Sequence, residues 1–290
     1  MYERHFGFTV KPFAMTPDPA FLYASRRHAM ALTMLEYSLE SQASFSVLTG
    51  AIGSGKTTLV RKLLQQLGDR VRVGLINHTH SRFQSIHGWV LSALGITTTG
   101  NSDIVLYETL VDSLVRQYAS GGRTLLIIDE AQNLSIEILE ELRLLSNINS
   151  EKDLLLQILL VGQPELRVKL SRPELMQFAQ RVSVFFDLKR LDRDETHAYV
   201  QHRLEVAGGD STLFRPEAID LVHARARGVP RLVNQICDFA LVYGFAEKKT
   251  WIDVELVAQV IRDCSGGLAL AASSSADTDG AVGMTSSSAA

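Results

Sequence analysis

The sequence has almost no cysteine and no long apolar run. Its two cysteines, Cys237 and Cys264, are too few for a disulfide framework, which is typical of a protein from a reducing compartment. The longest apolar stretch, over residues 154–162, is interrupted by Gln157 and is too short for a membrane-spanning helix. The first residues lack the apolar run of a signal peptide. We therefore expect a cytoplasmic protein with no membrane span of its own, unless a partner tethers it.

Neither sign of charge is in large excess. The chain has 29 Lys and Arg against 32 Asp and Glu, a formal net charge of −3. That balance argues against strong general attraction to nucleic acid or anionic lipid, although a local basic patch stays possible. With 290 residues, 46% hydrophobic and 21% charged, the chain has the composition of one large globular domain or two modest ones.

Short apolar runs alternate with helical patterns through the first two thirds of the chain. The runs predict strands over residues 45–48, 71–76, 124–128, 155–161 and 182–188. The three- and four-residue spacing of apolar side chains predicts helices from 25 onward and over 56–67, 83–94, 104–118 and 136–145. This alternation indicates an α/β domain with a mainly parallel sheet.

From Asp192 onward the pattern is helical. Asp192 and Glu195 form a capping-box pattern, and three further helices are predicted to begin at Pro216, Pro230 and Asp253. The expected organisation is an entry segment and helix over 1–40, an α/β core over 41–190, a four-helix lid over 191–264 and a disordered Ser/Ala/Gly-rich tail over 265–290. The prolines of the entry segment predict an extended chain that docks through its phenylalanines.

The strongest motif is a glycine-rich loop between a predicted strand and a predicted helix. It matches the P-loop pattern of Gly, four residues and Gly-Lys-Ser/Thr. Glycines let backbone N–H groups approach phosphate oxygens, Lys56 supplies a positive charge, and the Thr57 hydroxyl coordinates Mg²⁺. The alternative is a chance glycine-rich turn. The predicted ATP-binding residues are Gly50, Ala51, Ile52, Gly53, Ser54, Gly55, Lys56, Thr57 and Thr58.

A second motif places two carboxylates at the end of the strand predicted over 124–128. Asp129 is predicted to hold the same Mg²⁺ as Thr57, and Glu130 to orient a water for attack on the γ-phosphorus. Because phosphate transfer to a small molecule needs no such water, the pair favours an enzyme that hydrolyses ATP to ADP and phosphate. The alternative is a pair of charges that faces solvent at a strand end.

The motifs together resemble an AAA+ ATPase of the general secretion pathway protein A (ExeA)-like family. That family has relatives in type II secretion, pilus biogenesis and exosortase-associated polysaccharide systems. The resemblance covers about residues 1–263, and an α/β core with a helical lid is also the AAA+ architecture. The motifs that carry it are Phe6-Gly7-Phe8, Lys11-Pro12-Phe13, Thr16-Pro17-Asp18-Pro19, the P-loop, Asp129-Glu130-Ala131-Gln132, Leu144-Leu145-Ser146-Asn147, Gly162-Gln163-Pro164-Glu165-Leu166, Gln180-Arg181-Val182 and Gly228-Val229-Pro230-Arg231.

The resemblance implies roles for three further residues. Gln163 falls at the sensor-1 position, which reports the γ-phosphate or the attacking water, although it could simply start the next helix. Arg181 falls at the arginine finger that one subunit presents to its neighbour, although it could be an ordinary surface arginine. Arg231 matches sensor 2, which couples the lid to the bound phosphate, although it could be an exposed arginine at a helix start.

The resemblance also implies a function and partners. We expect a homo-oligomer that uses ATP to assemble or remodel a cell-envelope secretion, pilus or polysaccharide-export machinery, held peripherally at the inner membrane through a protein partner. Larger family members carry a transmembrane segment and a peptidoglycan-binding domain after the ATPase, so those properties are not expected to carry over. The alternatives are a DNA-binding AAA+ regulator of the transposition or initiator type, which the charge disfavours, and a slowly hydrolysing ATP switch.

Overall fold

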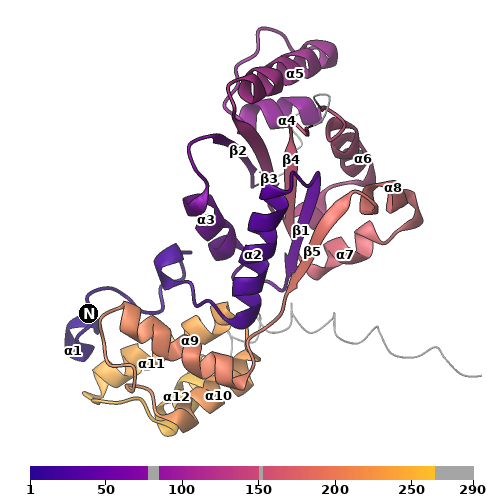
Figure 1. The fold of residues 1–290 in the computed structure, drawn as a ribbon. Coiled ribbons are helices and arrows are strands. Elements are labelled where there is room, and N and C mark those ends of the chain that lie inside the picture. The colour runs from indigo at the N-terminus through magenta and orange to yellow at the C-terminus, as the bar shows by residue number, and fades with distance from the viewer. Residues whose placement is uncertain (78–84, 150–152, 265–290) are drawn as a thin grey trace, which may run out of the picture. The chain divides into compact units, whose positions relative to one another are not determined.

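The computed structural model describes residues 1–77, 85–149 and 153–264 (Figure 1). The chain forms two compact units. One holds residues 26–50 and 56–188, and the other holds residues 1–25, 51–55 and the described residues from 189 onward. The predicted tail over 265–290 and the start of the helix predicted over 83–94 lie outside the described residues. The domain boundaries at residues 40, 190 and 264 remain predictions.

The first unit is built on a five-stranded parallel sheet in the order β2-β3-β4-β1-β5. All five strands predicted from the apolar runs are present, which confirms the α/β class. Parallel strands buried on both faces read as nearly continuous apolar runs, which is why the sequence marked them so clearly. The strands are β1 (Phe45–Gly50), β2 (Val71–Ile76), β3 (Arg123–Ile128), β4 (Gln157–Gly162) and β5 (Val182–Leu188).

Helices cover both faces of this sheet (Figure 1). Phe45 and Val47 of β1 point into a core formed with α4 (Ile86–Ala93), α5 (Asp103–Ala119), α6 (Ile136–Leu145), α7 (Pro164–Leu170) and α8 (Met176–Ala179). Ser46 lies on the opposite face, where Leu35 and Leu63 belong to α2 (Arg26–Glu40) and α3 (Lys56–Gln66). Successive strand residues alternate between the two faces, so the unit is a three-layer α/β/α structure.

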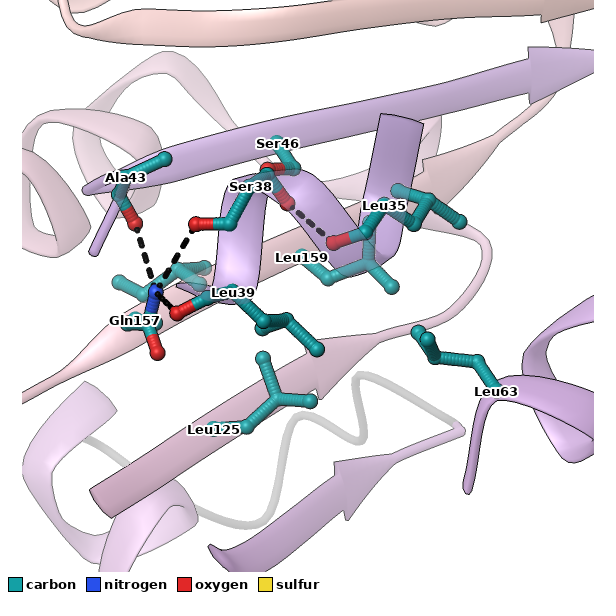
Figure 2. A pocket seen from close by; sticks show the side chains of 10 residues that line it. Leu35, Ser38, Leu39, Ala43, Ser46, Leu63, Leu125, Gln157 and Leu159 are labelled. Carbon is teal, nitrogen blue, oxygen red and sulfur yellow. Dashed lines mark hydrogen bonds between the residues drawn. The ribbon is translucent and has the colours of Figure 1, made fainter. Parts of the chain in front are cut away.

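Gln157, the polar residue that interrupts the longest apolar run, joins α2 to the sheet. Its side chain is buried, and its Nε2 donates to the carbonyls of Ser38, Leu39 and Ala43 at 3.2, 3.3 and 3.4 Å (Figure 2). Carbonyls in the last turn of a helix have no partner within the helix. The glutamine therefore adds a side-chain donor to carbonyls at and just beyond the end of α2, which also accept from the Ala43 N–H and from Arg123.

The second unit contains the four predicted lid helices. They are α9 (Arg193–Val206), α10 (Pro216–Ala226), α11 (Pro230–Ala246) and α12 (Val254–Asp263). The capping box is confirmed, because Asp192 Oδ1 accepts from the Glu195 N–H and Glu195 Oε2 accepts from the Asp192 N–H. Prolines begin α10 and α11 because the first helical position has no intrahelical use for an N–H.

The entry segment packs into this helical unit through its aromatic side chains, as predicted. Phe8 and Phe13 are buried in the helical core, and Arg203 of α9 stacks over Phe21 and donates to the Pro12 carbonyl at 2.6 Å. The segment is not extended throughout, however. It contains helix α1 (Glu3–Phe6), which ends at Gly7 in the left-handed conformation, and the 3₁₀ turn η1 (Pro19–Phe21), which the Asp18 side chain caps by accepting from the Ala20 N–H.

Across residues 1–77, 85–149 and 153–264, no helix combines the length and the apolar character that crossing a bilayer requires.

Candidate nucleotide site

The P-loop connects the end of β1 to the start of α3. Gly53 and Gly55 have φ angles of +76° and +100°, in the left-handed region that favours glycine. A Cβ at Gly53 would lie 2.5 Å from Arg231 Cβ, and the Arg231 N–H donates to the Gly53 carbonyl at 3.2 Å. The residue predicted as sensor 2 therefore lies against the loop at the beginning of α11, while its side chain is exposed.

The other loop residues differ in exposure. The Ser54 N–H donates to the Ala51 carbonyl at 3.1 Å within the turn, and Ser54 is buried. Ile52 is exposed, in keeping with a pattern that does not constrain its side chain. Thr57 is exposed on the first turn of α3, and the next residue, Thr58, is half-buried.

Lys56 is buried at the start of α3. Its Nζ donates to the Gly50 carbonyl at 2.7 Å. Burial lowers the pKa of Lys56, and the negative charges of Glu130 and Asp129 oppose that shift. A buried ammonium is costly unless it is paired, and the carboxylates nearby offset part of that cost. Phosphate oxygens would be further anionic partners for Lys56.

Asp129 and Glu130 follow β3 at the carboxyl edge of the sheet. The Asp129 N–H donates to the Ile76 carbonyl at 2.8 Å, and Asp129 Oδ1 accepts from the Glu130 N–H at 2.9 Å. Glu130 has a φ of +53°, an uncommon conformation for a residue with a side chain. The Glu130 side chain is exposed. Its carboxylate therefore lies at the carboxyl edge of the sheet and is accessible to solvent.

Gln163 lies beside Glu130, because β4 is next to β3 in the sheet. Gln163 Nε2 donates to Glu130 Oε2 at 3.1 Å. The residue also stands at the N-cap of α7 with Pro164 after it, so it does start the next helix. Its side chain makes no cap hydrogen bond and is used for Glu130 instead.

Gln132 is a residue of this cluster to which the sequence assigned no role. Its Nε2 donates to Glu130 Oε2, and its Oε1 accepts from the Gln163 N–H at 3.0 Å. It lies in the short 3₁₀ turn η2 (Ala131–Asn133). The sequence does show an amide side chain, Gln132, two residues after the Glu130 carboxylate. Nothing in the neighbouring residues indicates that this amide contacts residue 163.

Arg181 lies apart from these contacts, just before β5. Its Nη1 donates to Ser146 Oγ at 3.0 Å, and the side chain is half-buried. The two partners belong to separate motifs of the sequence, Gln180-Arg181-Val182 and Leu144-Leu145-Ser146-Asn147. The contact holds the arginine in one place within its own chain, and its use by a neighbouring chain remains a prediction.

The residues fit a magnesium nucleotide. Thr57 and Asp129 supply the hydroxyl and carboxylate oxygens that Mg²⁺ prefers. In the described part of the chain, no three His, Cys, Asp or Glu side chains gather as metal ligands. Mg²⁺ at a nucleotide site takes one or two protein ligands and completes its shell with water and phosphate.

A parallel α/β/α unit with a P-loop, two carboxylates after β3 and a polar residue after β4 is typical of P-loop nucleotide-binding proteins, of which the AAA proteins are one class. A family model described as an AAA domain matches residues 39–170. Residues 39–170 of the chain are thus similar to this family.

Within that class, the chain is similar to General secretion pathway protein A of Aeromonas hydrophila, with 38% identity over 247 residues. The match covers 85% of this chain and 45% of the relative, so the chain spans less than half the length of that protein. The resemblance predicted from the sequence motifs is thereby confirmed.

Solved structures of archaeal proteins share the fold. The Aeropyrum pernix ORC2 protein, in ADPNP-ADP complexes, has a TM-score of 0.67 and 18% identity over 88% of this chain and 72% of that one. Cdc6p of Pyrobaculum aerophilum has a TM-score of 0.66 and 20% identity over 86% and 71%. At these identities the likeness shows an AAA+ fold and no more.

Proposed function

We propose that this protein binds Mg-ATP and hydrolyses it to ADP and phosphate. The observation that carries the proposal is the hydrogen bond between Glu130 and Gln163 at the carboxyl edge of the sheet, next to Asp129. Ligands of open parallel sheets bind at this edge. A carboxylate and an amide there can orient an attacking water, a step that nucleotide binding alone does not need.

Each residue has a part in this proposal. The loop glycines and Lys56 hold the phosphates, and Thr57 and Asp129 hold the Mg²⁺, which neutralises charge on the phosphate oxygens. Glu130 polarises the water, and Gln163 orients the water or the γ-phosphate. Arg231, which lies against the loop at Gly53, is proposed as the sensor-2 residue, and Arg181 as the residue that completes the site of a neighbouring protomer.

The cellular role is proposed from the relationship with General secretion pathway protein A. The protein would act as a homo-oligomer in the cytoplasm or peripherally at the inner membrane, and ATP turnover would assemble or remodel a protein partner of an envelope secretion, pilus or polysaccharide-export machinery. Because the chain spans 45% of that relative, both the partner and the pathway are part of the proposal.

Two substitutions test the proposed activity. Lys56→Ala removes the buried charge and is expected to abolish binding of a fluorescent ATP analogue with Mg²⁺. Glu130→Gln keeps the size of the side chain and is expected to bind the analogue like the wild type while phosphate release falls by about 10² or more. Lys62→Ala, on the same helix, is the matched control and is expected to change neither. Equal ATP affinity of Lys56→Ala and the wild type would contradict the site assignment.

A further inference from the structure

We propose that Gln132 is a positioning residue for hydrolysis, which holds the Glu130 carboxylate against Gln163 without touching the nucleotide. The proposal rests on the proposed ATPase activity and adds a residue to it. The observation behind it is that one side-chain amide joins two residues from different strand ends: the carboxylate after β3 and the backbone after β4.

The direction of the Gln132 amide follows from its partners. Its Oε1 accepts from the Gln163 backbone N–H at 3.0 Å, and a backbone N–H can only donate. The Nε2 therefore faces Glu130 Oε2, which as a carboxylate oxygen can only accept. A flipped amide would set two donors together and two acceptors together. The amide thus holds a single orientation.

The surroundings of Gln132 are shaped for this contact. A Cβ at Gly162, the last residue of β4, would lie 2.9 Å from Gln132 Oε1, so the close approach of the amide depends on a glycine there. On the other side, Lys169 Nζ of α7 donates to the carbonyl of Gln132 and to that of Leu134, the latter at 2.6 Å. The backbone and the side chain of Gln132 are therefore held independently.

The contact matters because Glu130 is in a conformation that needs support. A left-handed φ of +53° is unfavourable for a residue with a Cβ and persists where surrounding contacts stabilise it. The side chains of Gln132 and Gln163 both donate to the same oxygen, Glu130 Oε2. Without Gln132, the exposed carboxylate loses the donor that comes from its own side of the sheet edge, and a water bound to it loses its alignment.

The test is Gln132→Ala in the full chain with Mg-ATP. We expect kcat to fall by about 10- to 100-fold, because a misplacement of about 1 Å in a reacting group can cost that much. The Kd of a fluorescent ATP analogue is expected to stay within about two-fold, since Gln132 touches no nucleotide. Gln180→Ala, an exposed glutamine at the end of α8, is the matched control and is expected to leave both unchanged.

The same substitution made in the Glu130→Gln variant distinguishes a positioning role of Gln132 from a structural one. In Glu130→Gln, adding Gln132→Ala is expected to lower the residual single-turnover rate by less than about two-fold, because the residue acts through the carboxylate. A full further loss in that background would overturn the proposal, as would a parallel rise in Kd, an unchanged kcat or an increased kcat. Gln132→Met, which keeps the length of the side chain, replaces the alanine variant if that variant does not fold.

Failure of the proposed activity gives a different result. If the wild type binds the analogue but releases no phosphate at any protein concentration, the ATPase proposal fails and the role of Gln132 fails with it. If the wild type turns ATP over and Gln132→Ala does so equally well, the role of Gln132 fails alone.

Discussion

At the scale of single residues, Gly228 shows how tightly the helical unit is assembled at the start of α11. It has a φ of +70°, and a Cβ there would lie 1.9 Å from the carbonyl oxygen of Leu191. The Leu191 N–H also donates to the Gly228 carbonyl at 2.9 Å. Gly7 has a similar φ of +76°, but its missing Cβ would meet nothing within 4 Å. Comparison of Gly228 and Gly7 therefore distinguishes the cost of a left-handed backbone from the cost of a steric clash at the Cβ.

We expect Gly228→Ala to lower the free energy of unfolding of the helical unit by about 3 kcal/mol or more, and Gly7→Ala by about 1 to 2 kcal/mol. Both changes disfavour the left-handed backbone, but only the first forces a Cβ into a backbone carbonyl. The measurement is urea unfolding followed by Trp251 fluorescence in a Trp89→Phe background, because Trp251 belongs to this unit. Equal losses in the two variants would contradict the steric argument.

The residues around Glu130 differ in whether the sequence predicted their role. Asp129 and Glu130 were predicted because they follow an apolar strand at a position with a known chemical use, whereas Gln163 was predicted only from the resemblance to the ExeA-like family. Gln132 was not assigned, because its partner is 31 residues away and the approach depends on the missing side chain of Gly162. The residues next to Gln132 in the sequence do not indicate that its side chain reaches the backbone of Gln163.

At the scale of elements, Asp220 joins two helices of the helical unit. It lies on α10 and accepts from Arg193 Nε and Nη2 of α9 at 2.7 and 2.8 Å, and His197 Nε2 lies 2.8 Å away. Arg193 first, and then His197, hold the pKa of the Asp220 carboxyl well below its usual range. This three-residue contact links the first turns of α9 to the middle of α10.

The stabilising effect of Asp220 is expected to depend on pH. Because its pKa is lower in the folded state, the carboxylate stabilises the unit fully above the unfolded value near 4, and this contribution falls as the pH drops below about 4. Asp220→Asn should therefore be less stable than the wild type at pH 7, with a gap that narrows below pH 4. The measurement is the urea midpoint reported by Trp251 between pH 7 and pH 3.

Asp194→Asn, on the exposed side of the same α9 turn, is the control for the loss of a charge and should leave the wild-type pH profile nearly unchanged. If Asp220→Asn and the wild type had the same midpoint at every pH, the contact would contribute nothing to stability.

At the scale of the whole molecule, the proposed catalytic site needs more than one chain. Arg181 donates to Ser146 in its own chain, and its proposed partner is the phosphate bound by a neighbouring protomer. An arginine that stabilises charge on a transferring phosphoryl group can be worth about 10³ to 10⁵ in rate. Activity should then depend on association of the chains.

We expect phosphate release per protomer to rise with protein concentration through the micromolar range, and Arg181→Ala to abolish that rise. Mixing Arg181→Ala with Lys56→Ala should restore part of the activity, because one chain keeps the nucleotide site and the other keeps the arginine. Arg172→Ala, an exposed arginine of the same unit, is the control and should behave like the wild type. Specific activity independent of concentration, with no gain on mixing, would contradict a shared site.

The sequence by itself determined the elements and the type of site. Apolar runs and helical spacing marked the five strands and the principal helices, because the period of side chains along the chain is a local property. The P-loop was equally clear, since a phosphate-binding turn is formed by eight consecutive residues. Capping residues at Asp192 and prolines at the start of α10 and α11 placed helix boundaries for the same local reason.

Only the tertiary structure decided which distant residues meet. The order β2-β3-β4-β1-β5 brings Glu130 and Gln163 to adjacent strand ends, and it gives Gln132 both of its partners. The same holds for the first 25 residues, whose aromatic side chains bury against helices that follow nearly 170 residues later. Contacts of this kind depend on packing across the whole fold, and no short stretch of the chain encodes them.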